Sequence, residues 1–180
     1  MNENQTNNRR TVATRGGAVL VAVSAAICGF LHQWEDGGKT QITVYADKLA
    51  GGLPTACNGL TNAVSPYPVV VGEVWSQEKC DTAEAMVIET TQLALGKCIT
   101  GRITQSAFDA LTSHAHNFGV GKTCGSTAVG LINAGHLVEG CHAISQTPDG
   151  KPNWSSAEGK FYQGLYNRRL AETALCLKDA

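Results

Sequence analysis

Residues 35–61 read EDGGKTQITVYADKLAGGLPTACNGLT, and they constrain the architecture more tightly than any other part of the chain. The centre of this stretch, Ile42–Tyr45, consists of β-branched and aromatic side chains, which are typical of a strand. Glycine pairs at Gly37–Gly38 and Gly51–Gly52 flank it and mark turns. The stretch therefore predicts short strands joined by turns, as in a small β-containing lobe.

The pattern becomes helical from Ser76 onward. Ser76 fits an N-cap with Glu78 in the first turn, and Gly96 is typical of a helix end. Apolar side chains then recur at helical spacing, so we expect further helices, at 105–117, 126–133, 137–144 and 161–177. A small β-containing lobe followed by a helical bundle is an α+β architecture.

Length and charge limit the classes of function. A chain of 180 residues fits one compact domain with at most an appendage. Residues 1–34 hold Arg9, Arg10 and Arg15 against Glu3, which leaves 11 basic and 14 acidic side chains in the remainder. A slightly acidic remainder lacks the clustered Lys and Arg that phosphate binding needs, so we expect no nucleic-acid partner.

An uncharged segment follows the basic leader. Residues 16–31 read GGAVLVAVSAAICGFL, and residues 32–34 extend the segment without charge. A spanning helix needs about 20 apolar residues, so this segment is short, and its many Ala and Gly residues make it weakly hydrophobic. Because basic residues precede it and none directly follows, we expect the N-terminus inside the cell and the bulk outside.

Three interpretations of this segment remain open. We favour an uncleaved membrane anchor over a cleaved signal peptide, for which small residues at 22–26 could serve a peptidase, and over a buried helix. The membrane anchor and the cleaved signal peptide both place the globular part of the chain in the periplasm. We therefore divide the chain into a tail and signal-anchor segment, residues 1–34, and a globular domain, residues 35–180, with residues 16–34 in the inner membrane.

Seven cysteines are many for this length, and none of them forms a C-x-x-C pair. Dispersed cysteines favour disulfides in an oxidising compartment over a zinc site or buried thiols. Cys28 lies inside the uncharged segment, and the other six belong to the globular part.

Glu35, Asp47 and Thr55 are the candidate catalytic residues. Cleavage of a glycosidic bond needs a protonated carboxylic acid and a second carboxylate that activates water or attacks the sugar. Glu35 follows an apolar helix-like segment, which suits an acid that must stay protonated. Asp47 lies just past the predicted strand, and the Thr55 hydroxyl could orient the water. By chemistry alone such a triad is weakly specific.

Three ordered blocks of sequence resemble the phage lysozymes of glycoside hydrolase family 24. The first block holds Glu35, Tyr45-Ala46-Asp47 and GLPTACNGLT at 52–61. The second is FDALTSHAHNFGVG at 108–121, and the third is GLYNRRLAE at 164–172. The spacings from Glu35 to Asp47 and from Asp47 to Thr55 are longer than is usual in that family, which we interpret as longer turns at Asp36–Thr40 and Lys48–Gly51.

The resemblance implies a lysozyme-like α+β fold that begins with a hydrophobic helix. It implies a muramidase that cuts the β-1,4 bond between N-acetylmuramic acid and N-acetylglucosamine in peptidoglycan and causes host cell lysis. Glu35 would donate the proton, while Asp47 and Thr55 would hold the water of an inverting reaction. His116 and Asn117 would line the sugar cleft. No metal or cofactor is implied, and we expect a monomer.

A weak anchor joined to an exported muramidase also resembles the signal-anchor-release endolysins. In such an enzyme the tethered form would be inactive, and release would let residues 16–34 fold onto the bundle and place Glu35. Proximity in the implied fold favours three disulfides, Cys57–Cys80, Cys98–Cys124 and Cys141–Cys176. Cys28 would then be free, or a partner in disulfide exchange during activation.

Two alternatives from other classes remain. A lytic transglycosylase needs Glu35 alone and leaves anhydro-sugar ends. A secreted binding protein stapled by disulfides would have no activity. Product analysis separates the first from a muramidase, and a Glu35→Gln variant separates the second.

Overall fold

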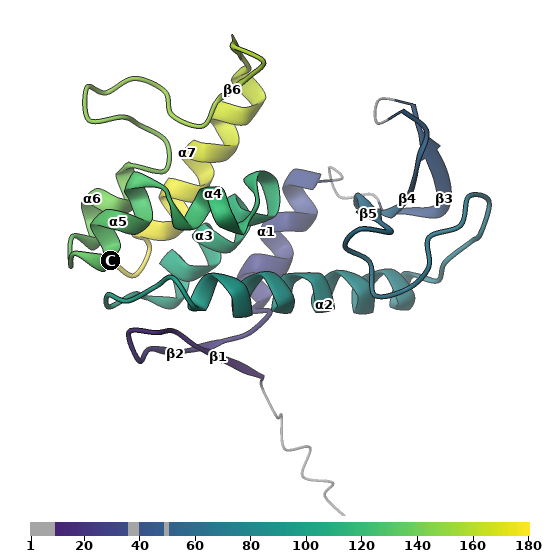
Figure 1. Ribbon diagram of the computed structural model, residues 1–180, viewed down its shortest axis with the longest axis horizontal. Helices are drawn as coiled ribbons and strands as arrows, with labels where there is room; N and C mark the ends of the chain where they lie inside the picture. Colours follow the sequence, from purple (N-terminus) through teal and green to yellow (C-terminus); the bar gives the residue numbers. More distant parts are fainter. Residues whose placement is uncertain (1–9, 36–39, 49–50) are drawn as a thin grey trace, which may run out of the picture.

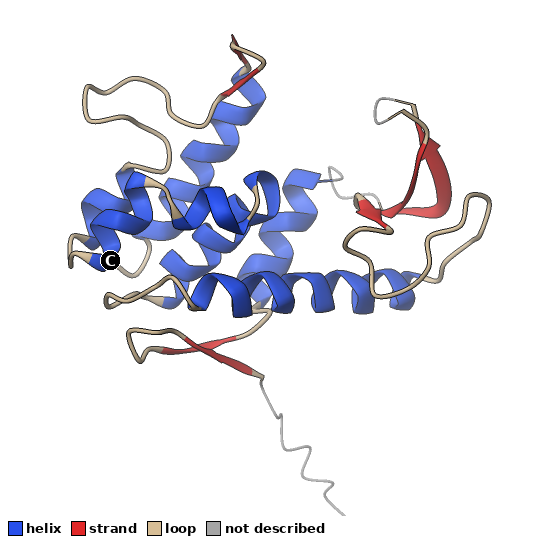
Figure 2. Ribbon diagram, in the orientation of Figure 1, coloured by secondary structure: helices blue, strands red, loops and turns tan. Residues whose placement is uncertain are grey.

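The computed structural model describes residues 10–35, 40–48 and 51–180. A helical lobe and a smaller β lobe lie near opposite ends of a long helix, α2 (Gln77–Gly96), which reaches from one lobe to the other (Figures 1 and 2). Ser76 caps α2, because its hydroxyl accepts a hydrogen bond from the Lys79 N–H. The predicted β-containing lobe and helical bundle are thus both present.

The β lobe is a three-stranded antiparallel sheet in the order β3 (Gln41–Asp47), β4 (Leu53–Cys57) and β5 (Leu60–Thr61). The predicted strand at Ile42–Tyr45 is confirmed as the central part of β3. Val44, Trp75 and neighbouring apolar side chains bury the inner face of the sheet against the start of α2. The predicted longer turns fall largely on residues 36–39 and 49–50, outside the described residues.

The helical lobe is built around α3 (Gln105–Phe118), in which every residue from Ser106 to Ala115 is buried. Helix α7 (Gln163–Leu177) packs on α3. Helices α5 (Thr127–Asn133) and α6 (Leu137–His142) pack against each other and contribute to the same core. These four confirm the predicted helices to within a few residues. A short helix, α4 (Val120–Cys124), follows Gly119 directly and is absent from the helices predicted from the sequence. A two-stranded hairpin, β6 (Ser156–Ala157) and β7 (Lys160–Phe161), precedes α7.

The N-terminal segment is helical only in its second half. A hairpin of β1 (Thr11–Ala13) and β2 (Val19–Val21) precedes α1 (Ala25–Glu35). Gly17 sits in the hairpin turn with φ +85°, a conformation open to glycine. Val12 and Leu20 of the hairpin are buried in the core of the helical lobe. Across the described parts of the chain, no helix combines the length and the apolar character that a membrane crossing requires.

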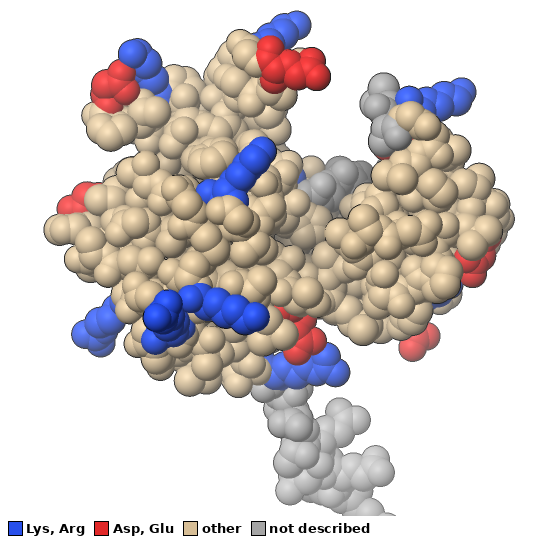
Figure 3. All heavy atoms as spheres, viewed as in Figure 1, with Lys and Arg blue, Asp and Glu red and all other residues tan. Residues whose placement is uncertain are grey.

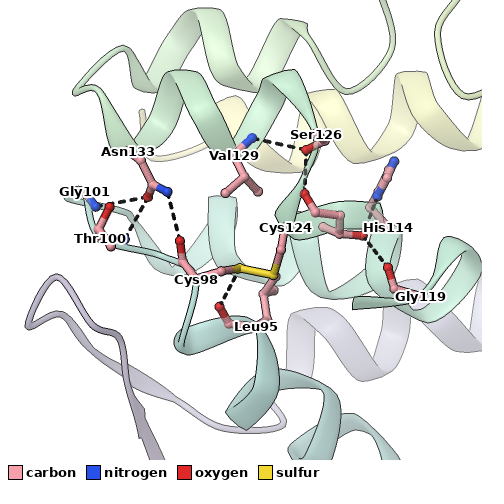
Figure 4. Close-up of a disulfide and its surroundings, with 11 residues drawn as sticks. Leu95, Cys98, Thr100, Gly101, His114, Gly119, Cys124, Ser126, Val129 and Asn133 are labelled. Atoms are coloured by element: carbon pink, nitrogen blue, oxygen red, sulfur yellow. Dashed lines mark hydrogen bonds between the residues drawn. A yellow bond between two sulfur atoms is a disulfide. The ribbon is translucent and has the colours of Figure 1, made fainter. Parts of the chain in front are cut away.

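Disulfide bonds cross-link distant parts of the fold. Three disulfides are present and match the predicted pairing: Cys57–Cys80, Cys98–Cys124 and Cys141–Cys176. Cys28 is free and exposed. The Cys98–Cys124 bond joins the end of α2 to α4 (Figure 4).

Candidate active site

The C-terminal end of α1 lies between the two lobes, and Glu35 is its last residue. The structure describes the backbone of Glu35 as part of α1, and the Glu35 side chain lies outside the described atoms. Ile27 and Leu31 of α1 are buried against Ile88 of α2. Packing therefore holds the helix end, and with it the backbone of Glu35, at the junction of the lobes.

Asp47 and Thr55 occupy neighbouring strands of the β sheet. Tyr45 pairs with Thr55 and Asp47 pairs with Leu53 in the β3–β4 ladder. Because side chains alternate along strands and directly paired residues share a face, Asp47 and Thr55 lie on the same face as diagonal neighbours. Thr55 is buried, and its hydroxyl donates to the Leu53 carbonyl at 3.0 Å, which leaves the oxygen's lone pairs to accept.

A pocket of about 320 Å³ borders α1 on the side of the β lobe. Both lobes and the two helices between them contribute to its walls. The lining residues include Leu31, His32, Asn58, Asp81, Glu84 and His116. The pocket thus places His116, one of the two predicted sugar-binding residues, opposite the β4–β5 turn. In the space-filling view the surface is hollowed between the two lobes (Figure 3).

A second hollow, of about 600 Å³, borders the same helix end on the side of α7. Trp34 of α1 faces Tyr162, Gln163 and Arg168 across it. Aromatic faces together with hydrogen-bonding side chains form the kind of surface that binds sugars. The residue before Glu35 therefore lines one hollow, and His32, three residues before Glu35, lines the other.

Asn117, the other predicted sugar-binding residue, is exposed at the end of α3. Its Oδ1 accepts a hydrogen bond from Arg169 at 3.1 Å. The structure therefore brings Asn117 to the surface beside a buried ionic cluster, while His116 lies in the pocket wall.

The ionic cluster below Asn117 is almost fully buried. The Glu172 carboxylate accepts from Ser113 at 2.7 Å and from Arg169 at 2.7 Å, and Arg168 lies at 3.4 Å. Burial raises the pKa of Glu172, and the two guanidinium groups oppose that shift. Arg168 and Arg169 also donate to Ser113 and Asn117 of α3, so the two arginines tie the last helix to the bundle.

Several residues of the site escaped the sequence analysis. Trp34, Asp81, Glu84 and Tyr162 line the two hollows but belong to none of the quoted motifs, and Asn58 lies within the first block without having been singled out. The position of Trp34 next to Glu35, a candidate catalytic residue, was the one available signal.

Comparisons with known proteins agree with this geometry. Residues 34–172 match the family model described as Phage lysozyme. The chain is 31% identical over 159 residues to a SAR-endolysin of Escherichia phage 933W, which covers 87% of this chain and 88% of that protein. It is 32% identical over 112 residues to an endolysin of Bacillus phage PZA, a match that spans 62% of this chain but only 39% of the relative's length.

A solved structure shares the arrangement of elements. The endolysin from Escherichia coli O157:H7 phage FAHEc1 aligns with a TM-score of 0.69 and 25% identity, over 87% of this chain and 94% of that chain. This likeness confirms the overall fold that the sequence predicted.

Proposed function

The chain belongs to the phage lysozyme family, and on that premise we propose that it is an endolysin that hydrolyses the β-1,4 bond between N-acetylmuramic acid and N-acetylglucosamine in peptidoglycan. One observation carries the proposal: α1 ends in Glu35 between two hollows, beside a sheet that holds Asp47 and Thr55 on one face. A glycan strand that crosses this helix end would meet all three residues.

In the proposed reaction Glu35 protonates the bridging oxygen as the bond to the sugar breaks. Asp47 takes a proton from a water molecule that attacks the opposite face of the sugar, and the Thr55 oxygen accepts the second hydrogen of that water. An inverting reaction of this kind needs room for water between the carboxyl groups. The placement of Glu35 on a helix end and of Asp47 on a separate strand is consistent with that need.

The two hollows supply the surfaces for the glycan. Trp34 and Tyr162 present aromatic rings, while Gln163, Arg168 and His116 present hydrogen-bonding groups. We propose that sugar rings on either side of the scissile bond occupy these hollows, and that Asn117 contributes at the edge.

Zymography on purified sacculi tests the activity. Glu35→Gln should abolish lysis while the protein stays folded, and Asp47→Asn and Thr55→Ala should each lower the rate by at least about a hundredfold, the usual worth of an acid, base or water-positioning group. Glu139→Gln on α6 is a matched control and should keep full activity. Retained lysis by Glu35→Gln would contradict the proposal.

Mass spectrometry of the products separates hydrolysis from the transglycosylase alternative. A muramidase adds water and yields reducing ends, whereas a lytic transglycosylase yields 1,6-anhydro ends at the same bond. Anhydro products would overturn the roles of Asp47 and Thr55 and leave only Glu35 in place.

We further propose that residues 16–34 anchor the chain in the host inner membrane, on the periplasmic side, before release. The names of full-length relatives, such as the SAR-endolysin of phage 933W, support this proposal. The hairpin and α1 pack onto the core of the helical lobe, which supports a released form in which these residues complete the enzyme. We expect the released enzyme to act as a monomer.

Leucine substitutions at exposed positions of α1 test the anchor. Ala25 and Ala26 are exposed on α1, and they line neither of the two hollows. Leucine at both should therefore strengthen membrane retention without disturbing the packed form or the proposed glycan surface, and lysis should stop. Ala174→Leu on α7 is the control. Normal release of the double variant, measured by membrane fractionation, would argue against anchoring.

A further inference from the structure

The backbone that leads into α1 is held by side chains of the helical lobe. Gln105 of α3 accepts a hydrogen bond from the Val21 N–H at 2.8 Å and donates its amide to the Val21 carbonyl at 3.1 Å. Gln92 of α2 accepts from the Val23 N–H at 2.9 Å. Two glutamines that lie about 70 to 85 residues further along the chain thus satisfy three main-chain groups just before the helix.

Asp109 of α3 completes this arrangement. Its Oδ2 accepts from the Ser24 hydroxyl at 2.6 Å, and its Oδ1 accepts from the Gln105 amide at 3.0 Å. Ser24 in turn accepts from the Ile27 N–H at 3.2 Å, so it caps the first turn of α1. Asp109 is only 1% exposed, and burial raises its pKa although both hydrogen bonds oppose the shift.

We propose that Gln92, Gln105 and Asp109 form a receiving site that positions α1, and with it Glu35, for catalysis. They are positioning residues, because they act on Glu35 through Ser24 and the helix. The inference rests on the proposed function and adds a condition for it. The enzyme is catalytically active only when residues 21–24 occupy the receiving site.

The chemistry of the site argues that it exists for this segment. A buried amide or carboxylate without a partner is costly, so these side chains favour a state in which the segment is present. Gln92 is fully buried and uses its oxygen for Val23, while its Nε2 has no partner among the described residues. Among the described residues, the one hydrogen bond of the Gln92 side chain is therefore to the N-terminal segment, and none is to another residue of α2.

Asp109→Asn is the sharpest perturbation because it changes no volume. The carboxylate accepts on both oxygens, whereas an amide can accept on only one. An Asn at this position must leave Ser24 without its acceptor or set its own NH₂ against the Gln105 NH₂. If the Gln105 amide turned over to avoid that clash, it would lose both hydrogen bonds to Val21.

The receiving site is tested on the purified full chain by amide hydrogen exchange and by steady-state kinetics on solubilised glycan strands. We expect Asp109→Asn and Gln105→Ala to lower exchange protection at Val21 and Val23 by about tenfold to a hundredfold, the equilibrium worth of a hydrogen bond to a charged group. We expect kcat to fall at least about tenfold with KM unchanged, because a small displacement of a reacting group is sufficient.

Asn133 offers a matched control. Its side chain also clamps main-chain groups, accepting from the Thr100 and Gly101 N–H groups and donating to the Cys98 carbonyl, but none of these bonds involves residues 21–24 (Figure 4). Asn133→Ala should reduce the free energy of unfolding to a comparable degree while kcat and the protection of Val21 and Val23 stay as in the wild type.

The outcomes separate this inference from the proposed function. Wild-type kcat in Asp109→Asn, or an equal loss of kcat in Asn133→Ala, overturns the receiving site while Glu35→Gln remains inactive. Activity in Glu35→Gln overturns the function itself. Ser24→Ala combined with Asp109→Asn should be no worse than either change alone, and additive losses would contradict coupling through Ser24.

Discussion

His114 should make the folded protein lose stability in mild acid. Its ring is 2% exposed in α3 and packs against Phe118 and Trp154 at centroid distances of 5.1 and 4.8 Å. Thr123 donates its hydroxyl to the Gly119 carbonyl, so the Nδ1 of His114 must be the donor in its 2.9 Å contact with Thr123 (Figure 4). The other ring nitrogen, Nε2, has no partner among the described residues.

Burial, followed by the charges of Arg169 and Arg168, lowers the pKa of His114 from 6.5 to about 3. The unfolded chain therefore binds a proton below pH 6.5 that the folded chain refuses until about pH 3. The stability that His114 contributes is complete above pH 6.5 and is lost as the pH falls. At pH 4.5, two pH units below the unfolded value, the loss is about 3 kcal/mol, at roughly 1.4 kcal/mol per unit.

The assay is urea unfolding of the wild type and His114→Gln at pH 7 and pH 4.5. Asp109 and Glu172 have pKa values raised by burial, so they act in the opposite direction, but both proteins contain them and their effects cancel in the comparison. The wild type should lose about 3 kcal/mol more than the variant between the two pH values. Parallel losses in the two proteins would refute the reasoning.

Two further changes test the packing of the lobes. Cys57→Ser with Cys80→Ser opens a loop of 23 residues and should lower the free energy of unfolding by about 3 kcal/mol, measured by urea titration without reductant; an unchanged midpoint would count against a structural role for that bond. Gly140→Ala places a methyl group 2.6 Å from the Ile132 side chain and 2.9 Å from the Ala128 carbonyl, so it should cost about 1–3 kcal/mol by the same titration; a neutral result would show that α5 and α6 separate easily.

Most of the helices and the central strand could be predicted from the sequence because their signals are local. Ser76 and Ser126 are N-cap residues that mark the starts of helices, and the β-branched and aromatic run at Ile42–Tyr45 predicts a strand. The short helix α4, which begins directly after Gly119, could not be predicted in this way. A helix of one or two turns is too short to show a periodicity of its own.

The N-terminal segment illustrates the opposite case. An uncharged apolar run predicts burial, but it does not distinguish lipid from a protein core, nor a hairpin from a helix. The residues that choose between these outcomes, Gln92, Gln105 and Asp109, bind main-chain groups of the segment. Main-chain groups are the same in every sequence, so no spacing or motif could pair these side chains with residues 21–24.

The candidate site could be predicted only where its residues lie close together in the sequence. Glu35, Asp47 and Thr55 belong to one continuous block, and the resemblance to a known family made them candidates together. The aromatic hollow needed Tyr162 from a distant hairpin to meet Trp34, and that meeting depends on how α7 packs on the bundle.

The distribution of the disulfides has a consequence for the order of assembly. All three lie between Cys57 and Cys176, and two of them secure α2 near its opposite ends, one to β4 and one to α4. The single cysteine before them, Cys28, is unbonded. All three bonds can therefore form without the hairpin and α1 in place, and packing of these elements onto the helical lobe requires no disulfide to be broken.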